Sequence, residues 1–185
     1  MKKVIFLIGV IISILVINPA IAQSPFNYFL MISVIPGESM DDRHRNWIEA
    51  LSFKEGITQS SVGARTAAGG ASATRAQFAE FTITKRIDRA SVLLKKYCSS
   101  GQHIKDVFLS CALKGGMQHE IYAVKLESVV VSGVKLSADS AGVLEEVTFS
   151  YGKIEWKYNI IDPKTGKLAI EVKGGWDLIK NQETR

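Results

Sequence analysis

Motifs that would carry catalysis, metal binding or phosphate binding are missing from this sequence. It contains no G-x-S-x-G nucleophile elbow, no H-E-x-x-H zinc motif, no EF-hand loop and no Gly-Lys-Ser/Thr phosphate loop. The 2 cysteines and 3 histidines are scattered without the spacing of metal ligands. Lysine and arginine form no cluster interleaved with aromatic residues, as a nucleic-acid surface would. We therefore expect no enzymatic activity, no metal, no cofactor and no nucleic-acid partner.

One pair of neighbouring acidic residues, Glu145 and Glu146, could be imagined as a general acid and base. Adjacent residues of a regular strand point to opposite faces, so the two carboxylates could not act together on one substrate. We expect both to be solvated charges on a strand.

Proline is scarce, at 4 residues, and no tract is biased enough to predict disorder. The 185 residues are 46% hydrophobic and 22% charged, which is an ordinary composition for one globular domain. The formal net charge is +5 and the sequence pI is about 9.2. Two of these positive charges belong to the N-terminal segment, so the rest of the chain carries only a mild excess.

The N-terminal segment has the pattern of a cleaved secretory signal peptide. Lys2 and Lys3 precede an uncharged apolar run, Val4–Ile17, which is short for a bilayer span of about 20 residues. Small residues end the segment, and we predict cleavage between Ala22 and Gln23. The predicted organisation is a signal peptide at 1–22 and one domain at 23–185, with no stable membrane span in the mature chain and a secreted or periplasmic location. The alternative is an uncleaved anchor.

Export places the two cysteines, Cys98 and Cys111, in an oxidising compartment. A disulfide between them would close a short loop and stabilise the chain by about 3 kcal/mol. The alternative is two buried free thiols that behave as small hydrophobic residues. The sequence does not choose between them, because it does not give the separation of the two Cα atoms.

Alternating apolar residues and turn signals predict a domain dominated by strands. In Trp47–Thr58, for example, Leu51, Phe53 and Ile57 stand at alternate positions. About seven or eight strands fit the mature chain, which indicates a small barrel or sandwich. The other regions with strand character are Phe26–Ile35, Gln77–Lys85, Val107–Leu113, Met117–Val131, Val147–Ile160 and Leu168–Ile179.

One convincing helix is predicted between two of these strands. Apolar residues recur at helical spacing over Ala90–Cys98, Asp88 is a plausible N-cap, and Gly101 suits the position just past the C-terminal end.

The segment Gln59–Ala76 contains Gly63, Gly69 and Gly70 among many small residues and has almost nothing to bury. We interpret it as a long loop, since loops of this length in compact domains are often functional. A plain linker is the alternative.

The alternation changes phase within Val147–Ile160. Apolar residues occupy odd positions up to Tyr151 and even positions from Ile154 onward. A one-residue β-bulge at Gly152-Lys153 would keep both halves facing the core, and such bends help a sheet to close.

Four stretches together resemble the haemolysin-coregulated protein (Hcp) family, whose members form the tube of the type VI secretion system. The resemblance covers residues 28–181, and the stretches are specific as a set, in this order and spacing. They are GESMDDRHRNWIEALSF at Gly37–Phe53, FTITKRID at Phe81–Asp88 with CSSGQH at Cys98–His103, EVTFSYGKIEWKY at Glu146–Tyr158, and GWDLIKN at Gly175–Asn181.

The resemblance implies a small closed β-barrel with one flanking helix. It also implies homohexameric rings that stack into a hollow tube, partners that include a spike protein, a sheath and small effector proteins, and secretion of the subunit itself. The long loop of the family falls at the same place, so we expect Ser60–Ala76 to order at a contact between subunits or rings.

The signal peptide departs from the family pattern, since these tube subunits are cytoplasmic before ejection. The chain could be a working subunit with a poorly used signal, a stand-alone exported relative, or a periplasmic or secreted binding protein. A soluble ligand-binding barrel is a further alternative and predicts an internal pocket. An outer-membrane barrel fits poorly, because charges within Glu145–Lys157 would face lipid at a cost of about 2–4 kcal/mol for a midplane Lys or Arg.

Overall fold

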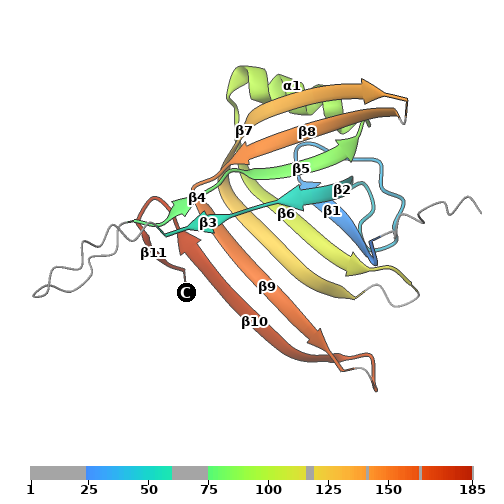
Figure 1. Cartoon of the computed structure of the whole chain (residues 1–185), viewed down its shortest axis with the longest axis vertical. Helices are drawn as coiled ribbons and strands as arrows, with labels where there is room; N and C mark the ends of the chain where they lie inside the picture. Colours follow the sequence, from blue (N-terminus) through green and yellow to red (C-terminus); the bar gives the residue numbers. More distant parts are fainter. Residues whose placement is uncertain (1–23, 60–74, 116–118, 141, 163, 185) are drawn as a thin grey trace, which may run out of the picture.

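The structure is a computed structural model that describes residues 24–59, 75–115, 119–140, 142–162 and 164–184, and its centre is a closed antiparallel barrel (Figure 1). The predicted small closed barrel with one flanking helix is confirmed, but six strands rather than seven or eight close it. In order around the wall they are β7 (Glu120–Asp139), β6 (His103–Leu113), β1 (Phe26–Ile32), β2 (Ile48–Lys54), β5 (Phe81–Arg86) and β8 (Gly142–Ser150), which pairs back onto β7.

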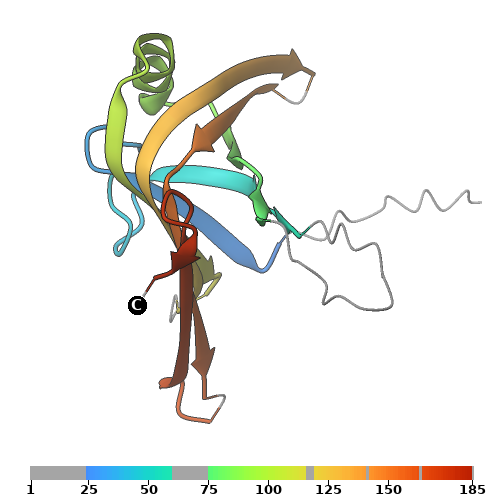
Figure 2. The same ribbon diagram turned by 90° about the vertical axis from the view of Figure 1, so that its left-hand side faces the viewer.

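The remaining strands extend the sheet beyond the barrel. β9 (Lys153–Ile161) pairs with the first half of β7, whereas β8 pairs with its second half. β10 (Leu168–Asp177) pairs with β9, and the short β11 (Gln182–Glu183) ends the sheet. Figures 1 and 2 show the β9–β10 pair projecting from the barrel as a two-stranded ribbon, at the end remote from the helix. A separate small hairpin joins β3 (Ile57–Thr58) to β4 (Gln77–Phe78).

Apolar side chains from all six wall strands fill the barrel. The pattern is clearest between β5 and β8, where Phe81 lies opposite Phe149 and Ile83 lies opposite Val147, all four 0% exposed. Burying each such side chain stabilises the fold by roughly 1.5–3 kcal/mol. In the part of the chain that the structure describes, this packed interior contrasts with the internal pocket expected of a ligand-binding barrel.

The predicted helix is α1 (Ala90–Ser100), but Arg89 is its N-cap residue, and Asp88, the predicted N-cap, lies one residue earlier. The Asp88 carboxylate accepts a hydrogen bond from the Ala90 N–H at 2.9 Å, and the Asp88 N–H donates in return to the Ser91 hydroxyl at 3.1 Å. Gly101 ends the helix in the left-handed conformation, at φ 63°. Among the helices of the described residues, none is long and apolar enough to cross a membrane.

The predicted β-bulge at Gly152-Lys153 is wrong, because the chain bends there between two strands and not within one strand. β8 ends at Ser150 and β9 begins at Lys153, so the bend separates two strands. A bulge would shift the register against β7, but Val130 pairs with Ser150 and Glu127 pairs with Lys153, which is one unshifted register.

The bend instead involves both strands of the pair. On β7, Ser128 has a φ of 55° next to the gap between β8 and β9. Because both strands leave the regular pleat together, the inward phase changes on both and the register is preserved. Phe149 before the bend and Ile154 after it are therefore both buried, at 0% and 1% exposed.

Of the two alternatives for the cysteines, the structure has the free thiols, since Cys98 and Cys111 form no disulfide. Cys98 lies in the last turn of α1, near His103 where β6 begins, whereas Cys111 lies eight residues along β6. At about 3.3 Å per residue, Cys111 lies roughly 26 Å along β6 from His103, whereas the two Cα atoms of a disulfide lie within about 7 Å of each other. Burial, with smaller effects from the charges of Glu120 and Glu55, raises the pKa of the Cys111 thiol to about 12 and keeps it protonated.

Five residues singled out from the sequence lie outside the described residues, as does the whole predicted signal segment, 1–22. They are Ala22, Gln23, Gly63, Gly69 and Gly70. The predicted cleavage site and the predicted assembly loop therefore stay predictions.

Candidate self-association surface

The β9–β10 ribbon carries a row of exposed apolar side chains on one of its faces. Tyr158 lies opposite Val172, and Ile160 lies opposite Ile170, and cross-strand partners point to the same side of a sheet. Their exposed fractions are 48%, 54%, 41% and 55% in that order. We call these four residues the apolar face.

The apolar face is a continuation of the inner surface of the barrel. On β7, Val124 and Leu126 are buried in the core at 1% exposed, and they lie opposite Trp156 and Ile154 of β9. Beyond Trp156 the same face of β9 continues past the barrel wall, where the described residues leave it largely uncovered. The strand pattern therefore builds a core-type face that needs a second layer, and exposed apolar patches of this kind mark interaction sites.

The opposite face of the ribbon is charged, and its charges neutralise one another. Lys157 pairs with Glu120, Lys153 with Glu155, and Lys173 with Glu171, each at 2.6 Å. Pairs of this kind are each worth at most about 1 kcal/mol, but together they leave this face well solvated and without unmatched charge.

Glu127 and the lysines around it form the centre of the charged face. The hydrogen bond from Lys125, followed by the contact from Lys153 at 3.3 Å, lowers the pKa of the Glu127 carboxyl against the opposing effect of burial. The hydrogen bond to Glu155 and then that to Glu127 raise the pKa of Lys153. These shifts favour the charged forms of all the partners.

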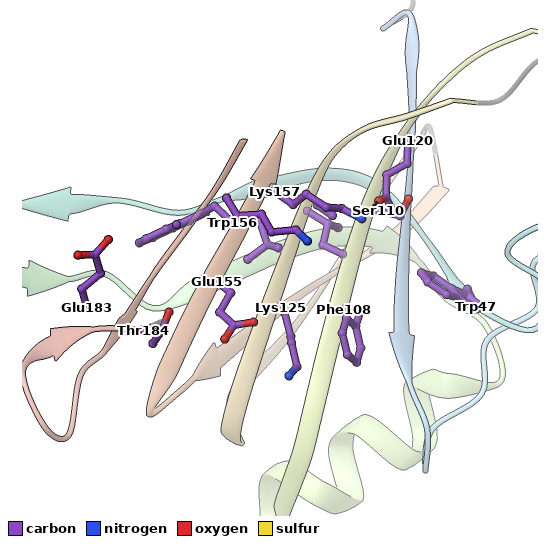
Figure 3. Close-up of a pocket in the computed structure, with 15 residues that line it drawn as sticks. Trp47, Phe108, Ser110, Glu120, Lys125, Glu155, Trp156, Lys157, Glu183 and Thr184 are labelled. Atoms are coloured by element: carbon purple, nitrogen blue, oxygen red, sulfur yellow. Dashed lines mark ion pairs between the residues drawn. The ribbon is translucent and has the colours of Figure 1, made fainter. Parts of the chain in front are cut away.

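A cleft of about 440 Å³ runs across this charged side of the sheet (Figure 3). Phe108 of β6, Lys125 of β7 and Glu155 of β9 are cross-strand neighbours in it, and the Lys125 ammonium lies 5.7 Å from the centre of the Phe108 ring. Trp47 forms its far wall. The mixed charges of the lining favour no single class of ligand.

A hydrogen-bonded series of Asp41, His44 and Ser110 adjoins this cleft. It was not predicted from the sequence. The His44 Nδ1 lies 2.7 Å from an Asp41 carboxylate oxygen, its Nε2 lies 3.1 Å from the Ser110 hydroxyl, and its ring stacks on Phe29 at 4.2 Å. The order of groups is that of a hydrolytic triad. Ser110 lies 66 positions from His44, so only the Asp-x-x-His spacing was visible in the sequence.

The surroundings of Ser110 oppose a catalytic role. Its side chain is 1% exposed, and it lies in mid-strand, paired with Phe29 of β1 on one side and Ala123 of β7 on the other. Backbone N–H groups in such a ladder are engaged in the sheet and are not available as an oxyanion hole. We conclude that the three residues fix the 33–47 loop to the outside of the barrel.

A second polar cluster lies beneath α1 and corrects the expectation for Glu145. This residue is 0% exposed rather than solvated, and its carboxylate accepts from Lys85 at 3.1 Å and from Ser91 at 2.7 Å. Lys85, also 0% exposed, donates in addition to Asp88 at 2.8 Å. Lys95 approaches the other carboxylate oxygen at 3.9 Å from the rim. Such a pair holds the helix in place, because separating it would leave a buried charge.

Neither cluster has the composition of a metal site. Among the residues that the structure describes, no group of three or more His, Cys, Asp or Glu side chains lies close enough to hold a metal ion.

Comparison with known proteins places this architecture in one family. A family model described as "Type VI secretion system effector, Hcp" matches residues 29–158. The chain is also 30% identical to protein hcp1 of Pseudomonas aeruginosa over 156 residues, which cover 83% of this chain and 95% of that protein.

Solved structures agree with this assignment. A structure described as a type six secretion system protein superposes with a TM-score of 0.79 at 28% identity, and the match covers 86% of this chain and 99% of that one. The crystal structure of Hcp1 from Salmonella typhimurium superposes with a TM-score of 0.71 at 29% identity, with the same coverage of 86% and 99%. Because the family model and the curated relative each cover most of the sequence, the chain belongs to the Hcp family of type VI secretion system proteins.

Proposed function

We propose that this chain is a structural subunit of the type VI secretion tube. In this proposal the subunits form hexameric rings, the rings stack into a hollow tube that delivers effectors, and the subunit is itself secreted. Membership of the Hcp family supports the proposal, and the uncovered apolar face of the ribbon is the observation of this chain that carries it.

A contact through the apolar face suits a ring. The apolar face lies on a ribbon at one side of the molecule. Among the described residues, no other strand of the same chain covers it. A head-to-tail contact between two different surfaces is heterologous, and it closes as a ring or continues as a filament. Burying the four side chains of the apolar face would remove a patch that water solvates poorly and would stabilise such a contact.

The proposal extends to three features that only the sequence supports. The segment 1–22 acts as a cleaved signal peptide, which gives a secreted or periplasmic chain. The segment Ser60–Ala76 orders at a contact between subunits or rings. The spike protein, the sheath and small effector proteins are the further partners.

Analytical ultracentrifugation with negative-stain imaging of residues Gln23–Arg185 tests the proposal. Two neighbouring residues of β10 give a matched pair, because Val172 belongs to the apolar face and Lys173 to the charged face. We expect rings in the wild type, loss of rings in Val172→Glu, and rings in Lys173→Glu. A wild-type chain that stays monomeric at all concentrations, or two variants that behave alike, would contradict the role of the apolar face.

A further inference from the structure

A carboxylate at the edge of the apolar face is held in place by two aromatic side chains. Glu55, in the short linker between β2 and β3, accepts a hydrogen bond from the Tyr122 hydroxyl at 2.6 Å and another from the Trp156 indole N–H at 3.1 Å. The ring of Phe53 stacks on that of Tyr122 with centroids 6.3 Å apart. We call Glu55, Phe53, Tyr122 and Trp156 the aromatic rim.

The negative charge of Glu55 is not neutralised by a cation among the described residues. Its two hydrogen-bond donors, the Tyr122 hydroxyl and the Trp156 indole N–H, are neutral, whereas the acidic residues of the charged face pair with lysines. The charge also acts on other groups at this end of the barrel. Burial is the main cause that raises the pKa values of Cys111 and Tyr151, each to about 12, and the charge of Glu55 contributes to both shifts, at Cys111 together with that of Glu120. An ionised carboxylate has about four lone-pair sites, so two remain open on Glu55 after both hydrogen bonds are counted.

We propose that the aromatic rim is a binding site for an arginine side chain of a second copy of this chain. A guanidinium can donate two parallel hydrogen bonds to the open side of a carboxylate, and aromatic rings attract the same planar cation. Trp156 belongs to the rim and also marks the point where the apolar face begins, so the rim is continuous with the proposed subunit contact. The chain also carries more cations than anions, 23 Lys and Arg against 18 Asp and Glu. The identity of the partner rests on the proposed function, but the cation site does not.

The role of Glu55 in a contact would be specificity. The apolar face alone would accept many apolar surfaces, whereas a fixed carboxylate selects the copy and the register that bring a guanidinium to it. The two neutral donors hold the carboxylate in one orientation, which lowers the cost of ordering it on binding.

Two measurements on residues Gln23–Arg185 test the inference. The first is a titration with Nα-acetyl-arginine amide, followed by tryptophan fluorescence, with the neutral citrulline analogue as the control ligand. We expect a saturable change in fluorescence with the arginine compound only. The change should be lost in Trp156→Phe, which removes the reporting side chain. In Glu55→Gln the affinity for the arginine compound should fall at least about tenfold. Glu49→Gln, the same change on neighbouring β2 but outside the rim, should bind as the wild type does.

The second measurement is the dissociation constant for self-association of the same variants. We expect Glu55→Gln to weaken it at least about tenfold and Glu49→Gln to leave it unchanged. Unchanged assembly of Glu55→Gln together with no selective arginine binding would overturn the cation site and leave the proposed tube function standing. A monomeric wild type that binds arginine amide through Glu55 would overturn the tube function and leave the cation site standing. Rings in Glu55→Gln despite lost arginine binding would exclude a second copy as the partner.

Discussion

Two consecutive strands, β8 and β9, pair with the two halves of β7 and have very different surroundings. Both alternate apolar and polar residues. The register of β9 against β7 continues into the end of β8 and shifts by one residue between Val131 and Gly133. The inward residues of β8 are sealed inside the barrel, with Phe149 and Val147 at 0% exposed, whereas Tyr158 of β9 is 48% exposed on the corresponding face. The difference lies in what covers the two strands: β8 faces the opposite barrel wall, whereas β9 leaves the core after Ile154 and is largely uncovered at Tyr158 and Ile160. The alternation of apolar residues in a strand indicates that one face must be covered, but it does not indicate whether the same chain or a second one covers it.

The largest expected effect tests this comparison directly. Phe149→Ala should lower the free energy of unfolding by about 3–5 kcal/mol, because it removes a fully buried ring and leaves a cavity. Tyr158→Ala should change the stability of the monomer by less than about 1 kcal/mol, because nearly half of the side chain is already in water. Urea denaturation at a protein concentration below that of assembly measures both. Equal losses would show that the ribbon is covered within one chain.

The next effect compares charges in the wall with charges on the ribbon. Glu145→Ala should cost about 3 kcal/mol, since it leaves the buried Lys85 ammonium without its partner. Glu120→Ala breaks the 2.6 Å pair with Lys157, whose partners are about a third exposed, and should cost less than about 1 kcal/mol.

The double variant Lys85→Met with Glu145→Leu serves as the control for this pair. It should recover much of the loss, because apolar replacement removes both buried charges. A single Glu145→Ala variant as stable as the wild type would show that Lys85 finds a full replacement partner in Asp88 and Ser91.

Local pattern was sufficient to predict a small barrel or sandwich and the helix that ends at Gly101, because these follow from alternation, helical spacing and turn chemistry. The choice of a closed barrel came from the resemblance to the Hcp family. Local pattern gave the wrong burial for residues whose surroundings depend on a strand distant in the sequence. Leu51 stands in the expected inward phase, but the β2–β5 register shifts between Ala50 and Ser52, and Leu51 is 47% exposed. Glu145 is buried because Lys85 lies directly opposite on β5, a partner 60 positions away that no local pattern reveals.

Substitution of two neighbouring glycines of β10 tests the two faces of the ribbon, with a smaller expected effect on stability. A Cβ atom on Gly175 would lie 2.3 Å from the Thr184 hydroxyl and 2.8 Å from the Ile154 carbonyl oxygen, whereas one on Gly174 would meet nothing within 4 Å. Gly175→Ala should therefore destabilise the fold by about 1–3 kcal/mol. Gly174→Ala should be neutral or stabilising by up to about 1 kcal/mol, because it reduces the entropy of the unfolded chain. Thermal unfolding of the two variants is the measurement, and a reversed order would contradict the packing of the C-terminal residues on the charged face.

The smallest expected effect concerns Glu127, at the joint between wall and ribbon. The hydrogen bond from Lys125 and the contact from Lys153 lower the pKa of its carboxyl in the folded state from the ordinary value of 4.5. A lowered folded pKa means that the contribution to stability is fully present above about pH 4.5 and is lost as the pH falls through the folded value. The side chain is 28% exposed, so we expect Glu127→Gln to cost less than about 1 kcal/mol at pH 7 and nothing measurable near pH 2. Urea denaturation of both proteins at the two pH values, repeated in high salt, would check it. Screening should shrink the difference at pH 7, since all three partners touch solvent. A difference that grows as the pH falls would have the wrong sign for a carboxylate stabilised by lysines, and would locate the cost of the substitution in packing instead.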